Sequence, residues 1–133
     1  MTPSETIKLI EFYRTEIIRL TLTIKKTAPK VHIKTLIVSI EKDLGFEKGE
    51  LLTGSRKHTR VYYRYSIMHV LYNFENATYK EIGRQFNRDH STVINANKKI
   101  QNAIDIKDEE ILQILTEVEN SYYRVINEII GCN

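Results

Sequence analysis

The sequence predicts an all-α fold of about six helices. Apolar residues recur at steps of three and four along most of the chain, and this spacing places them on one face of a helix. Only two prolines and five glycines interrupt 133 residues, whereas a protein of many short strands needs turn residues more often. Hydrophobic residues make up 41% and charged residues 28%, which allows a core beneath a charged surface. The length suits one domain, residues 1–133.

Two helices are expected in the first third of the chain. An apolar stripe predicts a helix over residues 5–27, with Ser4 as its cap and Ala28-Pro29 as its end, because the residue before a proline avoids the helical region. The stripe is expected to face a core, and a surface for a protein partner is the alternative. A second helix spans residues 33–44 and stops at Gly45, a residue type that readily ends helices.

A third, longer helix is expected over residues 57–74, with a basic start. Four cations gather there with no nearby acidic residue: Arg56, Lys57, Arg60 and Arg64. The N-terminus is the positive end of a helix dipole, so an external anion such as phosphate would relieve the repulsion. The buried face is expected to carry Val61, Tyr65, Met68 and Tyr72, widened by Ile67, Leu71 and Phe74.

Two shorter helices joined by a tight turn are expected next. Thr78 and Glu81 match a capping box, and the helix that they open turns Ile82 and Phe86 inward. The turn itself is expected at Asn87-Arg88. Two helices joined in this way are typical of a helix-turn-helix, whose second helix enters the major groove of DNA.

Asp89 is expected to cap the second of these helices, which spans residues 91–103. Its apolar positions are Val93, Ala96, Ile100 and Ala103. A final helix is expected over residues 107–129, with an acidic first turn that suits the dipole. The chain is therefore expected to hold three parts: an extra N-terminal helix in residues 1–30, a helix-turn-helix core in 31–104 and a C-terminal helix in 105–133.

The charge is strongly segregated along the chain. Residues 56–100 hold nine basic and three acidic side chains, a net of +6. Residues 1–55 have a net charge of +2 and residues 101–133 one of −5. A concentrated basic segment indicates a surface for a polyanion, although a solvated charged face is the simpler alternative for any single run.

One stretch carries a specific resemblance. EIGRQFNRDHSTVINANKKI, residues 81–100, resembles the signature of the C-terminal DNA-binding domain (domain IV) of DnaA, the bacterial replication initiator, whose pattern is roughly E-I-G-x-x-F-G-G-R-D-H-[TS]-T-V-x-H-A-x-x-K-I. Upstream, LLTGSRKHTRVYYRYSIMHVLYNF is similar to the family's basic loop and the long helix after it. The resemblance covers residues 33–104 well and the last helix less clearly. It implies sequence-specific binding of double-stranded DNA.

The resemblance also implies roles for single residues. Arg56 would enter the minor groove, and Asp89, His90 and Ser91 would face bases in the major groove. Thr92 and Lys98 would approach phosphates, and Thr78, Tyr79 and Lys80 would touch the DNA backbone from the first helix. The full set of expected DNA-binding residues is Arg56, Lys57, Arg60, Thr78, Tyr79, Lys80, Arg88, Asp89, His90, Ser91, Thr92, Asn95 and Lys98.

Three departures from the pattern bear on the sequence that would be read. The single Asn87 replaces two glycines and shortens the turn by one residue. Asn95 stands where the family usually has histidine, and Tyr65 replaces a glutamine that follows the arginine matched by Arg64. These changes are expected to preserve the fold and to alter the cognate sequence.

Other activities find little support. No G-x-x-x-x-G-K-[ST] phosphate loop occurs, so the chain resembles the DNA-reading module alone and no cofactor is expected. Asp89, His90 and Ser91 are adjacent, so on a helix they point apart and cannot converge as a catalytic set. The four histidines lack metal-ligand spacing, and the lone Cys132 cannot form an internal disulfide. We therefore expect neither an enzyme nor a metal site.

The expected location is the cytoplasm, at the nucleoid, because no membrane-length or signal-like apolar run occurs. The expected partner is double-stranded DNA, with no membrane. Binding of a second copy or another protein through the N-terminal or C-terminal helix stays an open alternative. So do two other functions, a transcriptional regulator of a mobile element or phage, and a protein-interaction module that has lost DNA binding.

Overall fold

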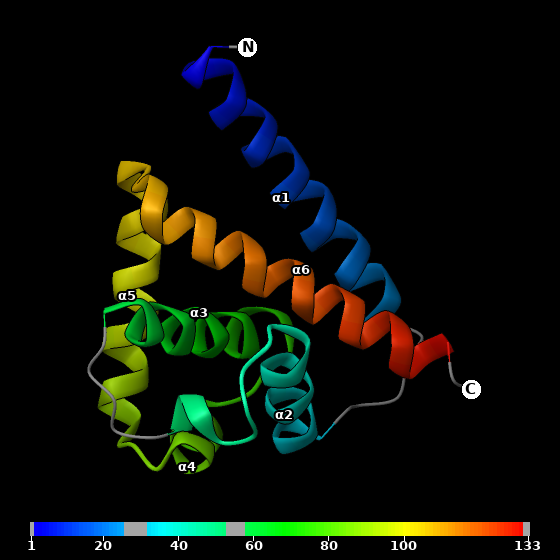
Figure 1. Ribbon diagram of the computed structural model, residues 1–133, viewed down its shortest axis with the longest axis vertical. Helices are drawn as coiled ribbons and strands as arrows, with labels where there is room; N and C mark the ends of the chain where they lie inside the picture. The colour runs from blue at the N-terminus through cyan, green and yellow to red at the C-terminus, as the bar shows by residue number, and fades with distance from the viewer. Residues whose placement is uncertain (1, 26–31, 53–57, 132–133) are drawn as a thin grey trace. The chain divides into compact units, whose positions relative to one another are not determined.

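The computed structural model describes residues 2–25, 32–52 and 58–131, which form six α-helices and one turn of 3-10 helix (Figure 1). Within these ranges there is no strand, as the all-α prediction requires. The chain divides into two compact units, residues 1–30 and residues 31–133. The first unit holds helix α1 and the second holds the other five helices.

Helix α1 spans Pro3–Lys25 and is capped by Thr2 rather than by Ser4. The backbone N–H of Glu5 donates to Oγ1 of Thr2 at 3.2 Å, and the Glu5 carboxylate accepts from the Thr2 N–H at 3.0 Å. This reciprocal pair is a capping box. The expectation for Ser4 was wrong because Pro3 already occupies the first helical position, which needs no N–H. The end predicted at Ala28-Pro29 lies outside the described residues.

Helix α2 spans Ile33–Asp43 and ends as predicted at Gly45, whose φ is +89°. The N–H of Phe46 donates to the Glu41 carbonyl at 2.8 Å, and that of Gly45 to the Lys42 carbonyl at 3.1 Å. These two bonds form a Schellman motif, which satisfies the last carbonyls of the helix. The apolar face of α2 is fully buried through Leu36, Ile37 and Ile40.

Buried Glu41 links α2 to the irregular segment that follows it. Its carboxylate accepts hydrogen bonds from the N–H groups of Gly49, at 3.2 Å, and Leu51, at 3.0 Å. These bonds hold the 3-10 turn η1, Glu50–Leu52, whose Leu51 side chain is completely buried. The segment after α2 is therefore anchored by a side chain of that helix.

Helix α3, His58–Phe74, is the centre of the second unit, with α4, α5, α6 and η1 packed against it (Figure 1). Because of these neighbours every residue from 66 to 71 is buried. The buried surface of α3 is therefore wider than the single apolar face predicted from the sequence. The residues buried as expected are Ile67, Met68, Leu71 and Phe74. Val61, Tyr65 and Tyr72, which were also expected on the buried face, are only half-buried. Val70 is buried as well, and polar residues take three further interior positions, namely Arg64, Ser66 and His69.

Helices α4, Tyr79–Phe86, and α5, His90–Ile106, follow α3. Helix α5 continues one turn beyond the predicted end at Ala103. It stops where Lys107 adopts a left-handed φ of 59° and the Asp108 N–H donates to the Ala103 carbonyl at 2.9 Å. Asp108 then caps α6, Glu109–Gly131, by accepting from the Ile111 N–H at 3.2 Å. Lys107, predicted as the first residue of this helix, belongs to the turn.

Helix α6 packs against α2, α3 and α5 through a continuous apolar stripe. Its buried members are Ile111, Ile114, Leu115, Val118, Tyr122, Val125 and Ile126. The hydroxyl of Tyr122 donates to Oε1 of the buried Glu75 at 2.7 Å. Burial, together with this carboxylate, raises the pKa of Tyr122.

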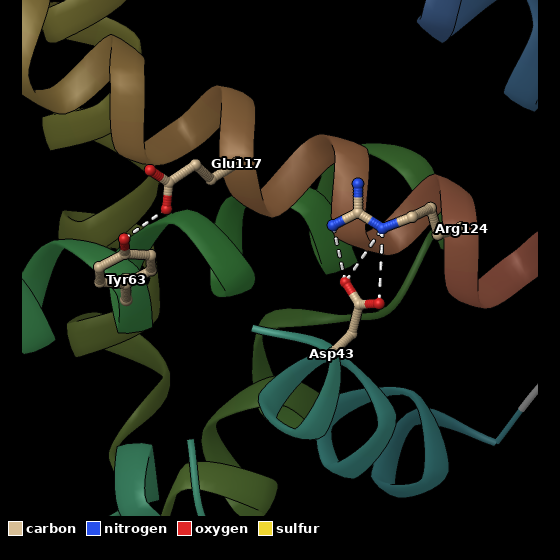
Figure 2. Close-up of polar contacts among 4 residues, drawn as sticks. All are labelled: Asp43, Tyr63, Glu117 and Arg124. Atoms are coloured by element: carbon tan, nitrogen blue, oxygen red, sulfur yellow. Dashed lines mark hydrogen bonds and ion pairs between the residues drawn. The ribbon is translucent and has the colours of Figure 1, made fainter. Parts of the chain in front are cut away.

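Two polar contacts fix α6 from outside the core (Figure 2). Arg124 donates through Nη2 to Oδ2 of Asp43 at 2.8 Å, so α6 is tied to the end of α2. The hydroxyl of Tyr63 donates to Glu117, so α6 is also tied to α3. Burial and this carboxylate raise the pKa of Tyr63 to about 12. Helix α6 is thus a brace across the second unit.

Candidate nucleic-acid interface

The start of α4 is defined by Thr78, as the capping pattern predicts. Its Oγ1 accepts from the Glu81 N–H at 3.1 Å, which satisfies one of the free donors of the first turn. Ile82 and Phe86 are buried, 0% and 1% exposed, and hold the short helix on the core. Three residues at the start of α4 were expected to contact the DNA backbone. Of these, Thr78 and Lys80 are exposed and Tyr79 is half-buried.

The turn between α4 and α5 depends on one residue in a left-handed conformation and on one residue without a Cβ. Asn87 adopts a left-handed conformation, φ 53° and ψ 45°, in the position where the family pattern has glycine. The next N–H, that of Arg88, donates to the Gly83 carbonyl at 2.8 Å. This brings the chain so close that a Cβ on Gly83 would lie 2.6 Å from the Arg88 carbonyl oxygen. The tight turn predicted at Asn87-Arg88 is confirmed.

Asp89 is the N-cap of α5, also as predicted. Its Oδ2 accepts from the Ser91 N–H at 3.3 Å and from the Ser91 hydroxyl, while Oδ1 lies 3.2 Å from Nδ1 of His90. The hydrogen bonds from Ser91 are the main cause that lowers the pKa of the Asp89 carboxyl below its ordinary value. The carboxylate is therefore ionised at neutral pH.

The first turns of α5 separate an inner from an outer face. Val93, Ala96 and Ile100 are completely buried, and Ala103 is 2% exposed. On the outside, the side chains of Asp89 and His90 are 66% and 52% exposed. Of the other residues expected to contact DNA from α5, Ser91, Asn95 and Lys98 are exposed and Thr92 is half-buried. The helix presents these polar groups at its N-terminus, the end of a helix that attracts an anion.

Two further exposed cations lie on this pair of helices: Arg84, which was not predicted as a site residue, and Lys99, which the sequence places beside Lys98 as a phosphate contact. Arg84 follows Lys80 by four residues on α4, so the two share a face of the helix. Lys99 adjoins Lys98 on α5. The spacing between Lys80 and Arg84 was the signal that could have identified Arg84. Arg88, which was expected, is half-buried in the turn.

The basic start of α3 differs from the expectation. Arg60 does have an acidic neighbour, because its Nη2 lies 3.3 Å from Oε2 of Glu50 in η1. Arg64 is 6% exposed and donates through Nε to the Leu51 carbonyl at 2.8 Å. Burial, and secondarily the charge of Arg88, lowers the pKa of Arg64. Arg64 is thus a structural residue, while Arg56 and Lys57 lie outside the described residues.

Among the described residues, no three His, Cys, Asp or Glu side chains gather closely enough to hold a metal ion. None of the described helices combines the length and the apolar character that a membrane span requires.

The comparison with protein families agrees with the geometry of α4 and α5. The sequence model of the family described as bacterial dnaA protein helix-turn-helix matches residues 33–100, about half of the chain. The match runs from the start of α2 into α5 and contains the whole helix-turn-helix. No solved structure matches the chain significantly. The chain belongs to the DNA-binding helix-turn-helix family of the bacterial DnaA protein.

Proposed function

We propose that this protein binds double-stranded DNA with sequence preference and places the first turn of α5 in the major groove. The observation that carries the proposal is the exposed polar group at that turn, Asp89, His90 and Ser91, at the N-terminus of the second helix of a helix-turn-helix. Recognition helices of this class contact base edges from the same position.

Capping by Asp89 is compatible with contact to a base. A carboxylate has about four lone-pair directions, and Ser91 and His90 take up part of this capacity. The remaining outward directions can accept a hydrogen bond from the amino group of cytosine. His90 and Ser91 are the neighbouring groups for the adjacent base edges.

Phosphate contacts are assigned to the cations and hydroxyls around that turn. Lys80 and Arg84 lie exposed on α4, and Lys98 lies exposed on α5. Within the described residues, none of these three has a carboxylate at ion-pair distance. Such contacts fix the orientation of a protein on the duplex without reading sequence. Thr78, Thr92 and Arg88 complete this set, and Arg56, Lys57 and Arg60 are assigned to the adjoining minor groove and backbone.

The family suggests the biological setting. We propose DnaA-box-like sites as the targets, with a role in replication initiation or its regulation. Asn87 and Asn95, which depart from the family pattern, support a preferred sequence that differs from the usual box. We propose no enzymatic activity for this protein, and we propose DNA in the cytoplasm as its partner.

Selection of bound sequences from a random duplex pool tests this function. We expect one enriched motif, and fluorescence anisotropy should give an affinity that falls steeply with salt. If about four to six phosphates are contacted, the slope of log K against log salt is about −4 to −5. A flat salt response or a pool without enrichment would overturn the proposal. An enriched motif unrelated to a DnaA box would support sequence-specific DNA binding and would favour transcriptional regulation over replication as the biological role.

A further inference from the structure

A cluster of five side chains joins the two helices of the helix-turn-helix to α3. We call it the interhelix cluster, and its members are His69, Tyr72 and Asn73 of α3, Tyr79 of α4 and Asn97 of α5. Asn97 is its centre, because its Oδ1 lies 2.7 Å from Nδ1 of His69 and 3.1 Å from Nδ2 of Asn73. One amide of α5 is thus connected to two residues of α3.

The hydrogen-bond directions in the cluster follow from the chemistry of its groups. A side-chain carbonyl can only accept, so Nδ1 of His69 carries the proton that is donated to Asn97. The Asn73 amide then donates to the same Asn97 oxygen and, at 2.8 Å, to the backbone carbonyl of His69. Asn73 is exposed and Asn97 is half-buried, but His69 is 4% exposed, so its imidazole lies largely out of water. A buried polar group of this kind is costly to leave unpaired.

Tyr79 connects α4 to the same cluster. Its ring stacks on that of Tyr72, with centroids 4.2 Å apart and planes inclined by 7°. The neighbouring Tyr72 hydroxyl is the main cause that raises the pKa of Tyr79. The tyrosine that the family resemblance assigns to the DNA backbone therefore has its ring stacked on α3.

We propose that Tyr79 and Asn97 are positioning residues, which set the angle of α5 on α3 and α4 and thereby the sequence preference, and that neither contacts DNA. This inference rests on the proposed function. Asn97 lies seven residues after His90, about 10 Å along a helix. A rotation of about 5° at Asn97 would displace His90 by about 0.9 Å, beyond the roughly 0.5 Å tolerance of a well-placed binding group. Nonspecific phosphate contact tolerates such a shift.

A double-mutant cycle on the full chain tests this assignment. Affinity is measured for the selected motif and for a random duplex with wild type, Tyr79→Phe, Asn97→Ala and the double variant. Asn97→Ala should lower the ratio of the two affinities about five- to twentyfold, while its affinity for the random duplex changes less than about twofold. Tyr79→Phe keeps the stacked ring, so it should change neither affinity by more than about twofold. Because Tyr79→Phe keeps the stacked ring, the double variant should be no worse than Asn97→Ala alone.

Direct contact gives a different result. If the Tyr79 hydroxyl binds phosphate, both duplexes lose affinity with Tyr79→Phe and the two effects multiply, which overturns the inference. Asn102→Ala, an exposed asparagine of α5, and Tyr123→Phe, a tyrosine of α6, are matched controls that should leave the ratio unchanged. Thermal melts establish that each variant is folded, and Asn97→Ser replaces the alanine variant if that one melts below the assay temperature. Absence of any preference in wild type would instead reject the proposed function.

Discussion

The two sides of the second unit use polar side chains in different ways. Where α6 crosses α2 and α3, polar groups bind partners distant in sequence, as in Arg124 with Asp43 (Figure 2) and Tyr122 with Glu75. At the start of α5, the described contacts of the Asp89 carboxylate are with its neighbours His90 and Ser91. The first arrangement holds helices together, whereas the second shapes a helix end and leaves its outer side in water.

Burial explains why the two sides differ. Glu75 is 5% exposed, and a carboxylate taken out of water is costly unless it is hydrogen-bonded. The Asp89 side chain is 66% exposed and does not need a distant partner. Polar groups that are exposed and bonded only locally keep hydrogen-bonding capacity for a ligand. This comparison predicts that substitutions at α6 and at α5 change different measurable quantities.

Substitution of Gly83 should have the largest effect, because it breaks the turn on which the presentation of α5 depends. In Gly83→Ala the new Cβ lies 2.6 Å from a backbone carbonyl oxygen that cannot move without opening the turn. We expect a loss of about 2–3 kcal/mol in the free energy of unfolding, measured in urea, and loss of motif-specific binding. Gly45→Ala is the control. Its φ is +89° with open space around the Cβ, so it should cost about 1 kcal/mol and spare DNA preference. Equal losses in both variants would contradict the prediction.

His90→Ala should change DNA binding without changing stability. The side chain is 52% exposed, so its removal should leave the melting temperature close to wild type. Affinity for the selected motif should weaken by about 1–3 kcal/mol, while affinity for random duplex stays nearly constant. Anisotropy titrations with both duplexes measure the difference. Equal weakening on both would show that His90 does not read bases.

Lys98→Ala tests the phosphate contacts. Lys98 lies exposed on α5 about two turns beyond His90, where a recognition helix is leaving the groove floor. Both duplexes should therefore lose affinity alike, and the salt slope should decrease by about one unit. The control is Lys34→Ala, an exposed lysine of α2 outside the interface, which should leave the slope unchanged. A selective loss on the motif would assign Lys98 to base readout.

Features encoded by neighbouring residues could be predicted from the sequence. The end of α2 at Gly45, the cap by Asp89 and the turn at Asn87 all depend on residues within a few positions of one another, and the structure has each of them. The buried face of α5 follows in the same way from its three- and four-residue steps. Asn87 took the place of glycine because asparagine tolerates the left-handed region better than most residues.

Features that depend on distant partners were missed. Arg60 and Arg64 looked like free cations because Glu50 and the Leu51 carbonyl, which bind them, lie ten and more residues earlier in an irregular segment. The stack of Tyr79 on Tyr72 has the same origin, since neither helix reveals its angle to the other. The roles of single residues in DNA binding stay predictions, which the variants above are designed to test.

Arg124→Ala should have the smallest effect and should spare DNA binding. The Arg124 side chain is 55% exposed, and an exposed ion pair contributes at most about 1 kcal/mol to stability. Hydrogen bonding by Arg124 holds the pKa of Asp43 below its ordinary value in the folded protein. The contribution is therefore complete above the unfolded pKa, about 3.9, and is lost as the pH falls through the lower folded value.

Urea unfolding of wild type and Arg124→Ala between neutral pH and the acid limb measures this contribution. The two free energies should differ at neutral pH and converge as Asp43 is protonated. The ratio of motif to random-duplex affinity should match wild type, because the pair ties α6 to α2 and lies outside the helix-turn-helix. A difference that persists in acid would assign the effect to the packing of the Arg124 side chain. A changed affinity ratio would show that α6 and the DNA-reading helix α5 are coupled. That result would contradict the prediction that substitutions in α6 do not affect DNA binding.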